Sequence, residues 1–113
     1  MKNKPAWATT QQKKAWRTVL KIAQLDICAG CGRPFGPKSR SVYSPYYPTL
    51  DHVITRANGG HHALDNLLLK HRRCNEERKD APPTGCDILW QEVVSSRLPW
   101  ARRVLELIAE RNA

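Results

Sequence analysis

Near the start of the chain, hydrophobic residues recur every three or four positions among polar ones, which is the spacing of a helix. Trp16 and Val19 belong to an apolar stripe that runs among lysines and arginines, and Thr9 or Thr10 is a suitable N-cap. A basic helix is therefore expected at about residues 10–25. This helix would either lie along phosphate groups or expose an ordinary solvated face.

The middle of the chain has short apolar runs separated by turn residues. Residues 50–54 are rich in β-formers and predict one strand, and residues 67–69 predict a second. The loop between them contains Gly59 and Gly60, a strong turn signal. A helix is expected over residues 71–79, because this stretch contains Glu and Arg but no Gly or Pro, and two prolines follow it.

The C-terminal third is expected to be helical, over about residues 86–112. Ile88, Leu89 and Val93 begin an apolar stripe that residues 95–98 interrupt. Pro99 suits the first turn of a separate final helix. The pattern thus predicts more than one C-terminal helix, forming a packing platform with no catalytic signal.

Length and charge narrow the function. A chain of 113 residues is expected to form a single domain, residues 1–113. The net charge of +9 favours a polyanionic partner, with nucleic acid as the default, although solubility or affinity for anionic membranes would also explain it. The chain has neither an export-type apolar segment near its start nor a membrane-length apolar run, so a cytoplasmic location is expected. Cysteines in that compartment more often bind metals than form disulfides. Cys86 lies outside both candidate ligand pairs and is expected to be a buried or half-buried thiol.

Two ligand pairs predict a zinc site. Cys28 and Cys31 form a C-x2-C pair, and His71 and Cys74 form an H-x2-C pair. Each pair brings two ligands to one side of a turn, and the two together complete the tetrahedral nitrogen and sulfur shell that zinc favours. A closed shell leaves no position for water, which makes this zinc structural. An alternative keeps the three cysteines and takes His62 as the fourth ligand.

A second set of polar residues offers oxygen atoms, which are hard metal ligands in contrast to the cysteine sulfurs. Asp51 and Asn75 offer carboxylate and amide oxygens, which suit Mg²⁺ or Mn²⁺. Asn75 directly follows Cys74, so the structural zinc would position it. His52 follows Asp51 on a predicted strand, where neighbouring side chains point to opposite faces. His52 can then face a substrate while Asp51 faces a metal, if the strand twists or bulges locally.

The order and spacing of these residues resemble the HNH, or ββα-metal, nuclease family in its zinc-bearing branch. The resemblance covers residues 28–80. It rests on Cys28-x2-Cys31, Asp51-His52-Val53-Ile54, Gly59-Gly60, Asn66-Leu67 and His71-x2-Cys74-Asn75. It implies an α+β fold with a ββα-metal core and a structural zinc, flanked by N- and C-terminal helices.

The resemblance also implies a reaction, hydrolysis of DNA phosphodiester bonds. His52 would be the general base that activates water, and Asp51 and Asn75 would hold one divalent cation, Mg²⁺ or Mn²⁺. Asn66 would fix the loop and so orient His52. Substrate contacts are expected from basic residues around the site. These are Arg56, Arg72, Arg73, Arg78 and Lys79.

Two positions depart from the family pattern. Asn75 stands where the family's final His is usual, which favours a hard Mg²⁺-type site, and His71 stands where the zinc branch usually has Cys. In its small size the chain resembles the free-standing HNH enzymes of bacteriophages. By that resemblance, its expected partners are double-stranded DNA, a second copy of the chain in a homodimer, or phage packaging proteins. The rival hypothesis is a non-catalytic zinc-finger protein that binds nucleic acid.

Overall fold

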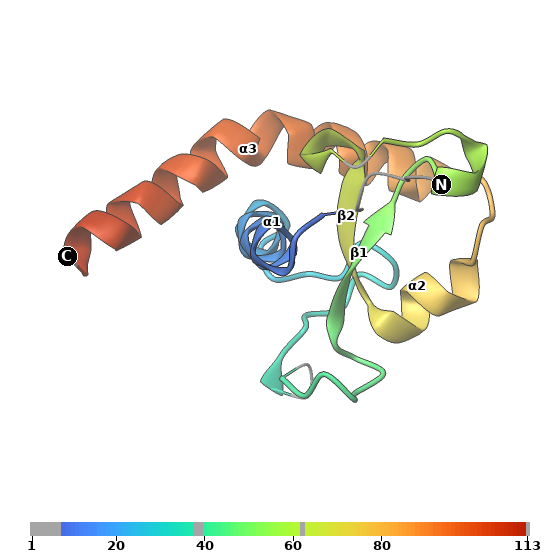
Figure 1. Ribbon diagram of the computed structural model, residues 1–113, viewed down its shortest axis with the longest axis horizontal. Coiled ribbons are helices and arrows are strands. Elements are labelled where there is room, and N and C mark those ends of the chain that lie inside the picture. Colours follow the sequence, from blue (N-terminus) through green and yellow to red (C-terminus); the bar gives the residue numbers. More distant parts are fainter. Residues whose placement is uncertain (1–7, 38–39, 62, 113) are drawn as a thin grey trace.

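A small antiparallel sheet and three helices make up the fold. The computed structural model describes residues 8–37, 40–61 and 63–112, without the side chain of Arg56. In chain order the elements are α1 (Thr10–Ala23), β1 (Pro48–His52), the 3-10 turns η2 (Arg56–Asn58) and η3 (Leu64–Asn66), β2 (Leu67–His71), α2 (Arg72–Arg78) and α3 (Gly85–Arg111). Figure 1 shows α3 along one side of the molecule, with α1 beneath it and α2 at the far end of the strands. The predicted α+β class with a β-β-α core is confirmed.

The first helix begins where its cap predicts. Thr9 is the N-cap, and its hydroxyl and the Gln12 side chain exchange hydrogen bonds with each other's backbone N–H in a capping box. The buried face consists of Val19, Leu20 and Ala23. This face packs against α3 and the two strands, so α1 is a part of the core.

The prediction of separate C-terminal helices was wrong, because α3 is one helix of 27 residues with Pro99 inside it. Val94, Leu98 and Ala101 lie on a single apolar stripe that packs into the core on both sides of the proline. This packing maintains the helix although Pro99 cannot donate the backbone hydrogen bond of its turn. A proline in this position bends a helix, and α3 is visibly bent in Figure 1.

The strands pair in an antiparallel register that joins Pro48 to His71 and His52 to Leu67. All five residues of β2 are buried. On the side of β2 away from β1, the Gln24 side chain takes the place of a further strand. Its amide accepts a hydrogen bond from the Leu69 N–H at 2.7 Å and donates one to the Leu69 carbonyl at 2.8 Å. Gln24 is fully buried, and this pairing satisfies the Leu69 N–H and the Gln24 amide inside the core, while the Leu69 carbonyl also accepts from the Ala29 N–H at 3.1 Å.

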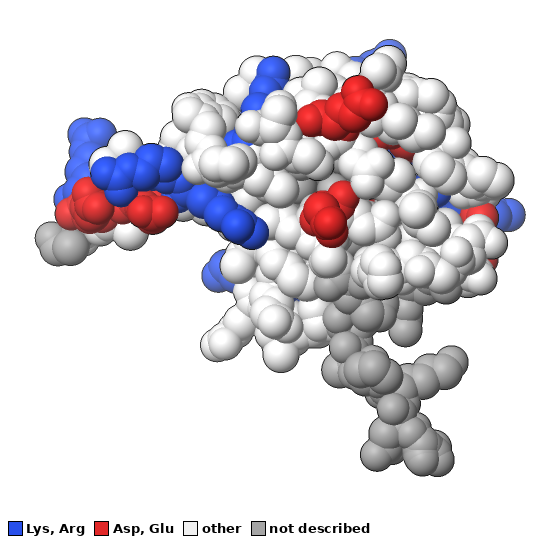
Figure 2. Space-filling view, turned by 90° about the horizontal axis from the view of Figure 1, so that it is seen from above, with Lys and Arg blue, Asp and Glu red and all other residues white. Residues whose placement is uncertain are grey.

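The surface over α3 carries little basic charge. Figure 2 shows this side as mostly uncharged, with Lys and Arg gathered beside Asp and Glu at the projecting end of α3. A polyanion would therefore meet more of the positive charge on other sides of the molecule. Among the described residues, no helix combines the length and apolar character needed to cross a bilayer.

Candidate functional site

The four residues predicted to bind zinc come together in space. One ligand atom from each of Cys28, Cys31, His71 and Cys74 lies within 4.8 Å of all the others. Ligands about 2.3 Å from a tetrahedral zinc ion lie about 3.8 Å from one another, so the cluster can hold the ion after its most distant ligand atoms approach by about 1 Å. His62, the alternative fourth ligand, lies outside the described residues. Cys86 is exposed rather than buried, contrary to expectation, and lies outside the cluster.

Local backbone geometry favours this cluster. The backbone N–H groups of Gly30 and His71 both donate to the Cys28 sulfur, each at 3.2 Å. Such donors stabilise a thiolate, which is the form that binds metal. Glycine at position 30 allows the backbone of this turn to pass close to Cys74, because a Cβ at this position would lie 2.7 Å from the Cys74 Cβ. Gly32 meets the other requirement of the turn, with a φ of +75°.

Protonation of the cluster couples metal binding to pH. Burial, and then the neighbouring Cys28 and Cys31, raise the pKa of the Cys74 thiol to about 12. Burial lowers the pKa of His71, which favours the neutral imidazole that can bind a metal. A zinc ion binding here must displace thiol protons, so acidification is expected to favour its release.

A separate pocket of about 260 Å³ is lined by His52, the predicted base, and by Asp51 and Asn75, the predicted cation ligands, whereas Asn66 lies outside its lining. Asp51 and His52 reach it from the end of β1, and Asn75 reaches it from α2. Its remaining lining residues are Leu50, Thr55, Lys79 and Asp80. Two neighbouring residues of β1 and a third residue more than twenty positions later therefore share one cavity, at the place where a strand end meets a short helix.

Asp51 is buried, and both of its ionic contacts use the same oxygen. Lys70 Nζ lies 2.7 Å from Asp51 Oδ2, and an Arg78 guanidinium nitrogen lies 2.8 Å from the same atom. Within the described part of the chain, no hydrogen bond or ion pair is assigned to Oδ1. Oδ1 is therefore the oxygen of Asp51 that can bind a cation.

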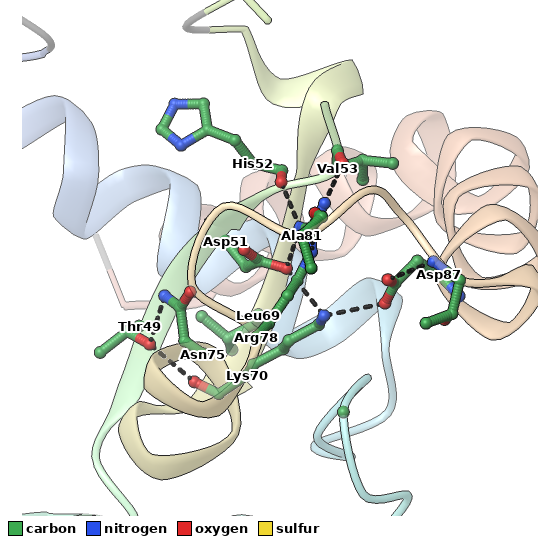
Figure 3. A network of polar contacts seen from close by, with 12 residues as sticks. Thr49, Asp51, His52, Val53, Leu69, Lys70, Asn75, Arg78, Ala81 and Asp87 are labelled. Carbon is green, nitrogen blue, oxygen red and sulfur yellow. Dashed lines mark hydrogen bonds and ion pairs between the residues drawn. The ribbon is translucent and has the colours of Figure 1, made fainter. Parts of the chain in front are cut away.

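Hydrogen bonds also fix the orientation of the Asn75 amide. Its Nδ2 donates to the Thr49 hydroxyl at 3.1 Å, a contact drawn in Figure 3, and to the Leu50 carbonyl at 3.2 Å. A carbonyl oxygen can only accept, so the atom facing Leu50 must be the nitrogen. The second amide atom, Oδ1, remains for a cation, as a hard-ligand site requires.

The loop after β1 is held by Asn66. Its Oδ1 accepts from the Ile54 N–H, and its Nδ2 donates to the carbonyls of Ile54 and His61, all at 3.0 Å. Val53 and Ile54 were predicted to continue the strand, but these contacts and a bond from the Val53 N–H to the Asn66 carbonyl turn them into the loop. Gly60 completes the turn, because a Cβ there would lie 1.7 Å from the Ile54 carbonyl oxygen.

We expect Asn66→Ala to lower the free energy of unfolding by about 3 kcal/mol. The change leaves one backbone N–H and two carbonyls without their partner, and an unsatisfied buried group costs about 1–3 kcal/mol. Urea denaturation of zinc-loaded protein measures the difference. Asp65→Ala, at an exposed neighbour, is the control. Equal stability of Asn66→Ala and the parent protein would show that these bonds do not hold the loop.

The predicted phosphate-binding residues occupy different surroundings. Arg73 and Lys79 are exposed, and Arg73 forms an ion pair with Glu77 at 3.1 Å. The Arg72 guanidinium lies 5.5 Å from the centre of the Tyr47 ring. The side chain of Arg56 lies outside the described residues.

Arg78 is placed differently from the phosphate contact predicted for it. Its side chain is only 7% exposed. It donates to Asp51 Oδ2 and to the backbone carbonyls of His52 and Val53. These contacts tie the end of α2 to the end of β1, which makes Arg78 an internal support of the pocket.

Sequence reasoning missed the buried ion pairs behind the pocket. Lys70 contacts both Asp51 and Asp87, and Figure 3 shows this chain of contacts directed away from the His52 ring. Burial alone would lower the pKa of Lys70, but its hydrogen bonds and ion pairs with the two aspartates raise it. Burial alone would raise the pKa of Asp87, but Lys70 and Thr84 lower it. The available signal was a lysine within an otherwise apolar strand run.

Comparison with known families agrees with this arrangement. Residues 28–81, just under half of the chain, match the family model described as HNH endonuclease. The matched segment contains the four-residue cluster, both strands and α2. Neither the curated proteins nor the solved structures gave a match.

Proposed function

We propose that this chain, which carries a domain of the HNH endonuclease family over residues 28–81, hydrolyses DNA phosphodiester bonds in a metal-dependent reaction. The observation that carries the proposal is the pocket lined by Asp51, His52 and Asn75 inside the matched segment. Under this proposal residues 1–113 form a single nuclease domain with a structural zinc.

His52 acts as the general base. Its neutral imidazole takes a proton from a water molecule as the water oxygen forms a bond to phosphorus. The bond between phosphorus and the 3′-oxygen breaks, and the departing oxygen is protonated from solvent. Asn66 supports this step from a distance, because it fixes the backbone two residues after His52.

Asp51 and Asn75 hold a divalent cation, Mg²⁺ or Mn²⁺. Each offers one oxygen that the described contacts do not use, and both residues line the same pocket. When bound, such a cation stabilises the negative charge that develops on the phosphate and the leaving oxygen. Two oxygen ligands of this kind leave room for water and substrate, as is usual for Mg²⁺.

The substrate is DNA, with double-stranded DNA expected. Lys79 lines the pocket. Arg56 follows the pocket residue Thr55, and Arg72 and Arg73 shortly precede the pocket residue Asn75. These four basic side chains are proposed to contact the phosphates. Phosphate contacts position the DNA but do not distinguish one base sequence from another. A homodimer, phage packaging partners and a cytoplasmic location stay predictions.

Plasmid cleavage tests the proposal. Zinc-loaded protein is incubated with supercoiled plasmid in metal-free buffer, with Mg²⁺ or Mn²⁺ added in separate reactions. The expected result is nicked or linear DNA only when a cation is added. EDTA is avoided as the control because it would also remove the structural zinc. Plasmid that is retarded on a gel but stays uncut with either cation would favour the rival function, a non-catalytic zinc-finger protein.

A further inference from the structure

The buried ion pairs extend from the pocket to the start of α3. Lys70 Nζ lies between Asp51 Oδ2, at 2.7 Å, and Asp87 Oδ1, at 2.8 Å. The side chains of all three residues are 4% exposed. Neither Lys70 nor Asp87 lines the pocket that contains Asp51 and His52. Asp87 is thus one ion pair removed from the proposed cation ligand.

Asp87 is held rigidly by the helix that carries it. Its Oδ2 accepts from the Thr84 backbone N–H at 2.9 Å, and its own N–H donates to the Thr84 hydroxyl at 3.1 Å. This capping box begins α3 and fixes the carboxylate beside Lys70 of β2. The position of the Asp87 carboxylate beside Lys70 is therefore set by the start of its own helix rather than by the pocket residues.

The charges of this group balance. Asp51 and Asp87 are negative, Lys70 and Arg78 are positive, and the ion pairs connect all four. Without Asp87, two positive groups would face a single carboxylate, the one proposed to bind the catalytic cation. Charges are weakly screened in a buried group, so this imbalance would oppose cation binding.

We propose that Asp87 is a positioning residue that acts through Lys70. It draws part of the Lys70 positive charge away from Asp51, so that Asp51 retains the negative charge needed to bind the catalytic divalent cation. This inference rests on the proposed function, because it takes Asp51 as a cation ligand. It gives the start of α3, which lies outside the matched HNH segment, a part in the reaction.

Direct cation binding tests the inference. Mn²⁺ is titrated into zinc-loaded, DNA-free protein, and free Mn²⁺ is measured by electron paramagnetic resonance. Asp87→Asn is expected to weaken binding roughly tenfold, as one uncompensated charge near the site predicts. The Mn²⁺ concentration for half-maximal plasmid cleavage should rise by the same factor, with the rate at saturating Mn²⁺ unchanged. Asp65→Asn, which removes one exposed carboxylate, is the matched control and should have little effect.

A double variant separates charge from folding. Lys70→Met with Asp87→Asn removes one charge of each sign and leaves no unpaired buried lysine, so Mn²⁺ affinity should return close to the parent value. If Asp87→Asn alone does not fold, the double variant still tests the inference, because a folded double variant that binds Mn²⁺ much more weakly than the parent would contradict it. The inference is overturned if Asp87→Asn binds Mn²⁺ as the parent does, or if the double variant binds no better than Asp87→Asn.

One further variant separates a failure of the proposed cation site from a failure of the proposed role of Asp87. Asp51→Asn is expected to lose Mn²⁺ binding at the pocket. Parent-like binding by Asp51→Asn would show that the proposed cation site is wrong, and the role of Asp87 would be rejected with it. Loss of binding in Asp51→Asn together with parent-like binding in Asp87→Asn would reject the role of Asp87 alone.

Discussion

Replacement of His52 by alanine is expected to lower the rate of plasmid cleavage by a factor of about 10² to 10⁴, the contribution typical of a general base. DNA binding and zinc content should be unchanged, because His52 is separate from the four-residue cluster and only partly buried. The rate is measured at saturating Mg²⁺ with zinc-loaded protein. Binding is measured with a labelled duplex in the absence of Mg²⁺.

His61→Ala is the matched control for this experiment. His61 is an exposed histidine on the loop that follows His52, and its hydrogen bond with Asn66 is through its backbone carbonyl, which alanine retains. It should cleave at nearly the parent rate. Parent-like cleavage by His52→Ala would remove His52 from the mechanism and require another base in the pocket.

The zinc cluster was predictable because its geometry is local. Cys28 and Cys31 occupy one turn, and His71 and Cys74 occupy another, so spacing within each pair already limits how the ligands can be oriented. The Thr9 cap of α1 was predictable for a similar reason, since its partner is three residues away. Features like these depend on a few neighbouring residues and can be read from the chain.

The supports behind the pocket were not predictable in this way. Gln24 bonds to Leu69, 45 residues away, and nothing near either residue indicates the pairing. Arg78 resembles the other exposed basic residues of its segment in sequence, yet three internal acceptors hold it. Tertiary packing decides between a solvated charge and a buried one, and a single sequence does not contain that information.

The long C-terminal helix illustrates how tertiary contacts can override a local signal. Pro99 and the polar residues before it are a reasonable sign of a helix end. The apolar stripe through Val94 and Ala101 nevertheless stays in register with the core across the proline. Burial of that stripe offsets the lost backbone bond, and the helix continues.

Replacement of Cys74 by serine is expected to remove the zinc and unfold the domain. The cluster joins the turn at Cys28 to the end of β2 and to α2. The helix α2 places no apolar residue fully in the core and is joined to β1 by polar contacts of Asn75 and Arg78, so apolar packing alone holds this helix weakly. A structural zinc contributes about 10–16 kcal/mol in small domains, which is comparable to the whole stability of a typical protein, about 5–15 kcal/mol. Loss of one ligand would also release Asn75, which directly follows Cys74.

Cys86→Ser is the matched control, because Cys86 is an exposed cysteine outside the cluster. Bound zinc is measured by native mass spectrometry, and folding by thermal denaturation followed by circular dichroism. Cys86→Ser should retain one zinc ion and the parent melting temperature, whereas Cys74→Ser should lose both the zinc and the cooperative transition. A zinc-free Cys74→Ser protein that melts cooperatively at the parent temperature would show that packing alone maintains the fold. The position of Asn75 opposite β1 would then depend on its bonds to Thr49 and Leu50 rather than on the metal.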